Sequence, residues 1–131
     1  MKRLNDMPWM RNWKGEIVEI PSIFVPPKRS KHPYWKYRDD KDRLKTLLSK
    51  FLNKEQLSEA EVKEIADYFL NYSLHVMSMA YASMDEEFRS IYAKENKELA
   101  RKIREMTSRA RSRLDLEAII GLLLEYGIDP I

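Results

Sequence analysis

From residue 39 to the C-terminus, apolar side chains recur at the three- and four-residue spacing of amphipathic helices. The first predicted helix covers residues 39–52, and its apolar positions are Leu44, Leu47, Leu48 and Phe51. Ser58 and Glu61 have the spacing of a capping box, in which each side chain bonds the other residue's backbone N–H, and they predict the start of a long second helix. The apolar stripe of that helix is Val62, Ile65, Ala66, Phe69, Val76, Met77 and Ala80.

Two more helices follow from the same pattern. Ser83 and Glu86 repeat the capping-box spacing and predict a break before a third helix, whose apolar positions are Phe88, Ile91, Tyr92, Leu99, Ile103, Met106 and Ala110. Asp115 is the predicted cap of a fourth helix, which ends at Gly127. We therefore expect an all-α fold in which residues 39–131 form an antiparallel four-helix bundle.

The first 38 residues follow a different pattern. Five of the six Pro and all three Trp lie here, and proline cannot continue inside a helix. Pro8 and Gly15 suit the first position and the C-terminal cap of one short helix, roughly Pro8 to Lys14. Residues 16–25 are β-branched and extended in character. We expect residues 1–38 to form an extended N-terminal arm that contains one short helix.

The charge of the chain is unevenly divided. Residues 1–38 hold nine Lys and Arg against three Asp and Glu, whereas residues 39–131 hold fifteen against eighteen, so the overall +3 comes from the arm. A basic arm on a mildly acidic body is typical of proteins that bind a polyanion. The arm is also rich in aromatic and β-branched residues, which disordered tails lack. We therefore expect it to be held by a partner or by the body of the protein.

Patterns for catalysis or metal binding are absent from the sequence. The chain has no Cys and three Gly, and its two His, His32 and His75, stand outside any metal-ligand spacing. His75 has the apolar neighbours of a packed histidine, with proton transfer as the alternative. We expect no enzyme, no cofactor and no small-molecule substrate. The longest apolar run, residues 118–124, is too short to cross a bilayer, and the start lacks a secretory apolar region, so a soluble protein without a transmembrane segment is expected.

Two groups of basic residues are candidates for binding nucleic acid. The group in the arm is Lys2, Arg3, Arg11, Lys14, Lys28, Arg29, Lys31, Lys36 and Arg38. Among them stand aromatic anchors that can stack on bases or hold the arm to a neighbouring subunit: Trp9, Trp13, Tyr34, Trp35 and Tyr37. The second group is Arg101, Lys102, Arg104, Arg109, Arg111 and Arg113, which either contact phosphates or form a solvated helix face. Since no reading helix is recognisable, we expect contacts with the phosphate backbone that do not depend on base sequence.

This layout resembles the major coat proteins of filamentous double-stranded-DNA viruses of hyperthermophilic archaea, the rudivirus, lipothrixvirus and tristromavirus groups. The residues that carry the resemblance are MKRLNDMPWMRNWKG and PPKRSKHPYWKYR, followed by the four helical stretches from Asp39 to Gly127. The resemblance implies a nucleocapsid protein that pairs with itself or a related coat protein as a dimer, clasps A-like double-stranded DNA and stacks into a helical filament. It also implies a location in the virion, and in the host cytoplasm before assembly.

Two other functions fit the sequence. One is a small helical subunit of a ribonucleoprotein, such as those of CRISPR effector complexes, in which the arm contacts protein or single-stranded RNA. The other is a helical protein-interaction adaptor, in which the arm folds back onto its own bundle. A preference for duplex or for single strands distinguishes the first from a coat protein, and the absence of nucleic-acid binding distinguishes the second.

Overall fold

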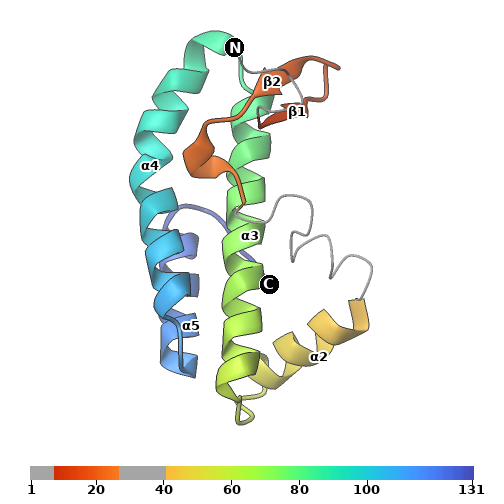
Figure 1. Ribbon diagram of the computed structural model, residues 1–131, viewed down its shortest axis with the longest axis vertical. Coiled ribbons are helices and arrows are strands. Elements are labelled where there is room, and N and C mark those ends of the chain that lie inside the picture. The colour runs from red at the N-terminus through yellow and green to blue at the C-terminus, as the bar shows by residue number, and fades with distance from the viewer. Residues whose placement is uncertain (1–7, 27–40) are drawn as a thin grey trace.

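The computed structural model describes residues 8–26 and 41–131. Within these ranges the chain is mostly helical. A short antiparallel hairpin and a 3₁₀ turn come first, in the order β1 (Trp9–Arg11), β2 (Ile17–Glu19) and η2 (Ser22–Phe24). Four helices follow, α2 (Lys41–Leu52), α3 (Glu59–Ser83), α4 (Glu86–Arg109) and α5 (Arg113–Glu125) (Figure 1).

The predicted start of the second helix is confirmed at α3. Ser58 Oγ accepts a hydrogen bond from Glu61 N at 3.1 Å, and Glu61 Oε1 accepts one from Ser58 N at 3.0 Å. This capping box satisfies two of the backbone donors that every helix leaves unpaired at its start. The predicted break after α3 is confirmed as well, because Met84 and Asp85 have extended backbone and α4 begins at Glu86. The capping box predicted at Ser83 and Glu86 does not form, since Ser83 is the last residue of α3 and the N-cap of α4 is Asp85.

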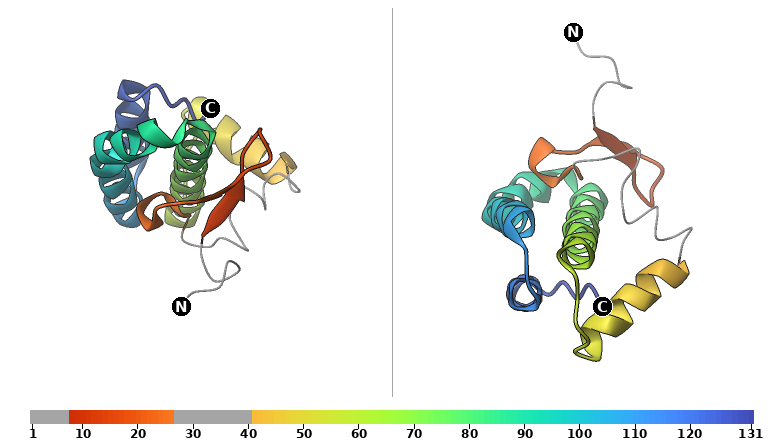
Figure 2. Two further views of the ribbon diagram at one scale, coloured as in Figure 1. Left: turned by 90° about the horizontal axis from the view of Figure 1, so that it is seen from above. Right: turned by 60° about the horizontal axis from the view of Figure 1, so that its bottom comes forward.

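The two long helices α3 and α4 lie side by side and run in opposite directions, and α5 packs against both of them (Figures 1 and 2). Helix α2 packs on α3 and lies at a steep angle to the other three (Figure 2). The four predicted helices are therefore present. Three of them form the closely packed part of the body, and α2 leans away from it.

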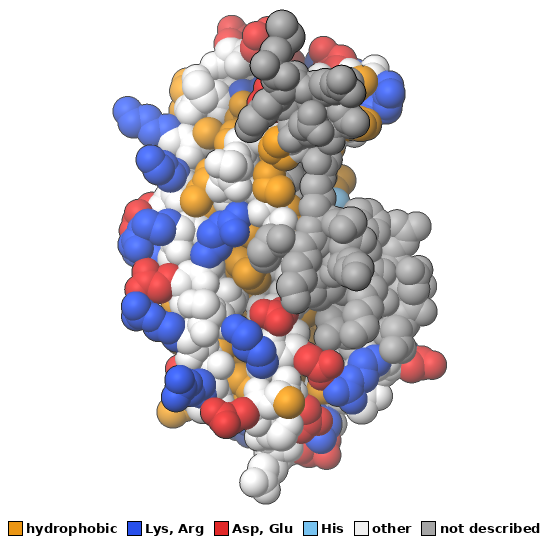
Figure 3. Space-filling model, in the orientation of Figure 1, with side chains coloured by type: hydrophobic (Ala, Val, Ile, Leu, Met, Phe, Trp, Pro, Cys, Tyr) orange, Lys and Arg blue, Asp and Glu red, His pale blue; other side chains and the backbone are white. Residues whose placement is uncertain are grey.

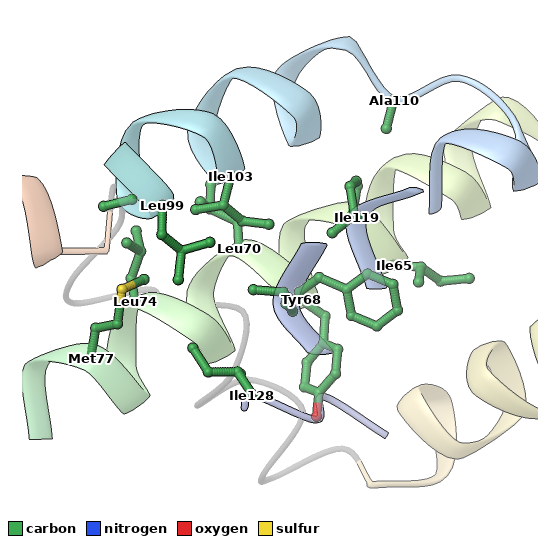
Figure 4. Close-up of a cluster of buried hydrophobic side chains, with 14 of the residues drawn as sticks. Ile65, Tyr68, Leu70, Leu74, Met77, Leu99, Ile103, Ala110, Ile119 and Ile128 are labelled. Carbon is green, nitrogen blue, oxygen red and sulfur yellow. The ribbon is translucent and has the colours of Figure 1, made fainter. Parts of the chain in front are cut away.

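The core lies where α3, α4 and α5 meet (Figure 4). Its fully buried members come from all three helices and include Ile65, Leu74, Met77, Leu99, Ile103 and Ile119. Burying one such side chain stabilises the fold by about 1.5–3 kcal/mol. The C-terminal segment is tied to the same core, since the Tyr68 hydroxyl donates to the carbonyl oxygen of Pro130 at 3.0 Å.

Helix α5 begins differently from its predicted start. The N-cap is Ser112, and Asp115 stands three residues inside the helix. The Asp115 carboxylate accepts from the backbone N–H groups of Arg111 and Ser112, at 2.8 and 3.1 Å, and these two bonds lower the pKa of its carboxyl group. The predicted end is confirmed, since Gly127 has a φ of +76° just after the helix.

The short helix predicted over residues 8–14 is wrong. Trp9–Arg11 pairs with Ile17–Glu19 as a β-hairpin, with Met10 opposite Val18. The side-chain oxygen of Asn12 accepts from the backbone N–H groups of Lys14 and Glu16, both at 3.0 Å, and Gly15 closes the turn with a φ of +82°. A helix of two turns is costly to nucleate, whereas the hairpin buries Val18 against the body. The fold is therefore helical with a small two-stranded sheet.

Residues 8–26, the described part of the predicted arm, pack on α3 and α4. Phe24 is fully buried, with its ring centroid 6.2 Å from that of Tyr81 and 5.9 Å from that of Tyr92. The hydroxyl of Ser78 in α3 donates to the carbonyl oxygen of Phe24 at 2.7 Å. This part of the chain is therefore built into the same core as the helices, and it does not extend away from them.

Candidate nucleic-acid interface

Half of the predicted nucleic-acid contacts fall outside the described residues. These are Lys2, Arg3, Lys28, Arg29, Lys31, Lys36 and Arg38, together with the aromatic anchors Tyr34, Trp35 and Tyr37. The remaining candidates lie on the β-hairpin and on α4 and the start of α5, and their environments differ sharply.

The two basic residues of the hairpin are exposed but engaged. The guanidinium of Arg11 donates to the carbonyl oxygen of Gly15 at 2.8 Å. Lys14 Nζ lies 3.3 Å from Asp85 Oδ1 at the start of α4, and 5.2 Å from the ring centroid of Trp13. Both contacts are weak ones at the surface, so phosphates can compete for these cations.

The two aromatic anchors of the hairpin have different roles. Trp9, at the start of β1, is half-buried, as expected of a side chain that holds the hairpin to the body. Trp13, in the turn, is 75% exposed. An exposed indole next to Lys14 is a surface that can stack on a planar group or enter a partner protein.

The outward face of α4 carries a row of cations. Lys94, Lys97, Arg101, Lys102 and Arg109 are all exposed and lie on one side of the helix. Figure 3 shows Lys and Arg side chains gathered along the left edge of the molecule, over α4, with acidic groups between them. At 1.5 Å per residue, the row from Lys94 to Arg109 is about 22 Å long.

Two glutamates partly neutralise this row. Arg101 lies between them, 2.5 Å from Glu98 and 2.9 Å from Glu105, and Arg109 lies 3.1 Å from Glu105. The bonds to Glu98 raise the pKa of Arg101 and lower that of Glu98. Among the described residues, Lys94, Lys97 and Lys102 make no direct ion pair, which leaves these three ammonium groups available to an anion.

Arg104, another predicted contact, is turned towards the N-terminal segment. Its guanidinium donates to the carbonyl oxygens of Ile23 and Val25 at 3.0 and 2.5 Å, and to that of Ser22 at 3.3 Å. Partial burial lowers the pKa of Arg104 from its ordinary high value, yet a guanidinium stays charged at any physiological pH. Its donors are committed to holding η2 on α4.

Arg113 is committed in the same way at the start of α5. It donates to the backbone carbonyl oxygens of Phe51 and Glu55, and its guanidinium carbon lies 5.2 Å from the ring centroid of Phe51. It thereby satisfies carbonyl groups at the end of α2. Arg111, by contrast, has an exposed side chain. The predicted cluster of residues 101–113 is thus divided into exposed cations and two arginines that hold the fold together.

Lys94 and Lys97 are not among the basic residues predicted from the sequence. Both lie on the α4 face of Arg101, at spacings of seven and four residues, which a helical projection of residues 86–109 would have found. Basic residues are denser in residues 101–113 than in residues 86–100, so local charge density alone points to the later stretch.

An apolar groove of about 560 Å³ lies where the hairpin turn meets the end of α3 and the start of α4. Trp13, Met84, Phe88, Ile91 and Tyr92 form much of its lining, with Lys14, Asp85 and Glu95 among its polar residues. Phe88 and Ile91 are each about half exposed, at 51% and 53%. These apolar side chains line one groove together, whereas most exposed apolar residues on a protein surface stand singly.

The comparisons with known proteins identify no family for the chain. No protein-family model, no curated protein and no solved structure matches it.

In residues 8–26 and 41–131, no three side chains of the metal-binding types come together. His75 is half-buried on α3, and burial lowers its pKa. In the same part of the chain, every helix is too short or too polar for a bilayer crossing.

Proposed function

We propose that this protein packages double-stranded DNA as the coat protein of a helical filament, without reading the base sequence. The observation that carries the proposal is the charge of residues 1–38, nine Lys and Arg against three acids, interleaved with Trp and Tyr. In this proposal the arm contacts the phosphate backbone and does not read bases. Phosphate contacts position a protein on a duplex but specify no sequence.

The exposed cations of α4 support the same function. Among the described residues, Lys94, Lys97 and Lys102 make no direct ion pair, and the row that contains them is about as long as six or seven base pairs of duplex at 3.4 Å per pair. A single protomer with so few contacts would bind weakly. Many protomers along one duplex would bind strongly, because each bound copy raises the effective concentration of the next.

The proposed assembly uses the protein as a dimer, formed with a second copy or a related coat protein, within a nucleocapsid of the virion. The antiparallel four-helix bundle is retained as the proposed body of the subunit, of which α3, α4 and α5 are the closely packed part. No cofactor or small molecule takes part.

The experiment is a titration of the full-length, nuclease-treated protein with duplexes of unrelated sequence at several salt concentrations. We expect equal affinity for all duplexes and a steep fall with salt, followed by electron microscopy that shows filaments containing nuclease-resistant DNA. Binding that does not change with salt contradicts the proposal. A clear preference for single-stranded RNA over duplex would instead favour the small subunit of a ribonucleoprotein.

A protein-interaction adaptor is the second candidate, and the apolar groove favours it. Its lining combines the aromatic side chains of Trp13, Phe88 and Tyr92 with the carboxylates of Asp85 and Glu95, which suits a basic peptide segment that presents an aromatic side chain. A synthetic peptide with the sequence PPKRSKHPYWKYR, residues 26–38 of the chain, is a suitable probe. Binding of this peptide that Phe88→Asp abolishes, in a protein that binds no duplex, would replace the first proposal with this one.

A further inference from the structure

One ammonium group of the chain lies at the apolar groove between the hairpin turn and α4. Lys14 Nζ is 3.3 Å from Asp85 Oδ1 and 5.2 Å from the ring centroid of Trp13, and all three residues line the groove. Lys14 and Asp85 are seventy-one residues apart in the chain, so the tertiary fold brings this pair together. This side of the groove therefore offers a carboxylate and an indole face to one cation.

The Asp85 carboxylate is available because it does not cap its helix. Asp85 is the N-cap of α4, where an aspartate side chain ordinarily accepts from the backbone N–H of the second or third helical residue. Within the described chain that hydrogen bond is absent, and 62% of the side chain is exposed. An exposed ion pair such as the one with Lys14 holds its cation weakly, so another cation can take the place of Lys14.

The charge of this end of the molecule selects a cationic partner. Four exposed acids stand in residues 85–95, namely Asp85, Glu86, Glu87 and Glu95. The two basic residues of the same stretch do not offset them at the groove. The guanidinium of Arg89 donates to the carbonyl oxygens of Ala82 and Met84, and the side chain of Lys94 leaves the helix about 100° away from that of Glu95. A phosphate or an anionic membrane is therefore disfavoured here.

We propose that the groove binds a basic peptide through a lysine or arginine side chain that displaces Lys14 from Asp85 and Trp13. A neighbouring aromatic side chain of the peptide then packs on Phe88 and Ile91, which are each about half exposed. Lys14 is a built-in competitor that occupies the cation position when no partner is bound. This displacement rests on the peptide-binding function proposed for the groove and is independent of DNA packaging.

Fluorescence anisotropy of a dye-labelled peptide, titrated with the full-length, nuclease-treated protein, tests the displacement. The probe is PPKRSKHPYWKYR, and the same peptide with Gln at its five Lys and Arg positions should bind much more weakly. Lys14→Gln should strengthen binding of the basic probe about two- to fivefold, because the peptide no longer competes with an exposed ion pair. Asp85→Asn should weaken it by a similar factor.

A double variant separates displacement from general repulsion between like charges. In the Asp85→Asn protein the further change Lys14→Gln should bring no gain, because Lys14 competes through Asp85. Arg11→Gln is the matched control, since it removes the same charge from an exposed position of the same hairpin and should leave peptide binding unchanged. No gain with Lys14→Gln, an equal gain with Arg11→Gln, or a gain that persists in the Asp85→Asn protein would overturn the proposal.

A duplex titration of the same variants keeps the two functions apart. Lys14→Gln should weaken duplex binding, because it removes a predicted phosphate contact, while it strengthens binding of the peptide. Absence of duplex binding would overturn the packaging function and leave the displacement of Lys14 standing. A basic probe that does not bind the wild-type protein would overturn the displacement and the adaptor function together, and would leave DNA packaging standing.

Discussion

The guanidinium of Arg104 in α4 lies 2.5 Å from the carbonyl oxygen of Val25, seventy-nine residues earlier in the chain. The same group also donates to the carbonyl oxygens of Ser22 and Ile23. One side chain therefore satisfies the backbone of η2 and fixes where the N-terminal segment leaves the body. A residue predicted to bind phosphate has a structural task instead.

Replacing Arg104 with methionine should destabilise the protein by about 1–3 kcal/mol, because partly buried carbonyl oxygens lose their donor while the apolar stem is kept. Urea denaturation measures this loss. Arg109→Met is the matched control, because the Arg109 side chain is 77% exposed and pairs only with Glu105 among the described residues. Equal effects of the two substitutions would show that the contacts of Arg104 contribute nothing to stability.

Truncating Phe24 to alanine should cost about 3–5 kcal/mol, since the side chain is fully buried between Tyr81 and Tyr92. Urea denaturation followed by tryptophan fluorescence measures the loss, and two of the three Trp, Trp9 and Trp13, lie in the hairpin. Ile17→Ala is the control, because Ile17 is 44% exposed on β2. If Phe24→Ala left the stability unchanged, residues 8–26 would not be packed on the helices in solution.

The capping box of α3 should make stability depend on acid. Lys50 Nζ bonds the Glu61 carboxylate at 2.7 Å, Ser58 N bonds it as well, and together they lower the pKa of Glu61 from 4.5 to about 2. A carboxyl group with a lowered folded-state pKa stabilises the protein above its unfolded pKa, so this contribution is complete above pH 4.5 and is lost as the pH falls towards 2.

Urea denaturation at several pH values across this window checks the prediction. The wild-type protein should lose more stability between pH 4.5 and pH 2 than Glu61→Gln does. Glu59→Gln, in the same first turn, is the control and should keep the wild-type slope. The same acid dependence in wild type and Glu61→Gln would contradict the assignment.

The double variant Lys94→Gln, Lys97→Gln should weaken duplex binding equally for all sequences. Each lost phosphate contact reduces the slope of log K against log salt by about 0.9, so the pair should reduce it by about 2. Lys45→Gln, Lys54→Gln removes the same charge from exposed positions in and just after α2 and should leave the slope unchanged. An identical loss in both double variants would mean that net charge matters and the α4 face does not.

The helices could be predicted from the sequence because their causes are local. The spacing of Leu44 and Leu47, or of Ser58 and Glu61, acts within one or two turns and is readable along the chain. For residues 8–15 the same local pattern predicted a helix, and the structure has a hairpin there. Pro8 and Gly15 fit a helix and a hairpin alike, and the choice is made by the burial of Val18 and Phe24 against helices far away in sequence.

The basic residues could be found from the sequence but their tasks could not be distinguished. Arg101, Arg104 and Arg113 differ in what lies opposite each of them, and those partners come from Glu98, from residues 22–25 and from the end of α2. Periodicity places a side chain on a helix face, but it does not say which backbone carbonyl groups a distant segment will bring there.

The contact between Arg104 and Val25 also has a consequence for the order of folding. The N-terminal segment is synthesised first, but its docking surface is complete only when α4 has been made, seventy-nine residues later. The chain is synthesised at about 5–20 residues per second, so several seconds pass between the synthesis of Phe24 and that of the helix that buries it. Until then its apolar surface is open to chaperones or to other nascent chains. Closing so long a loop is entropically slow, so docking of residues 8–26 should be the last step of folding, after the α3–α4 hairpin has formed.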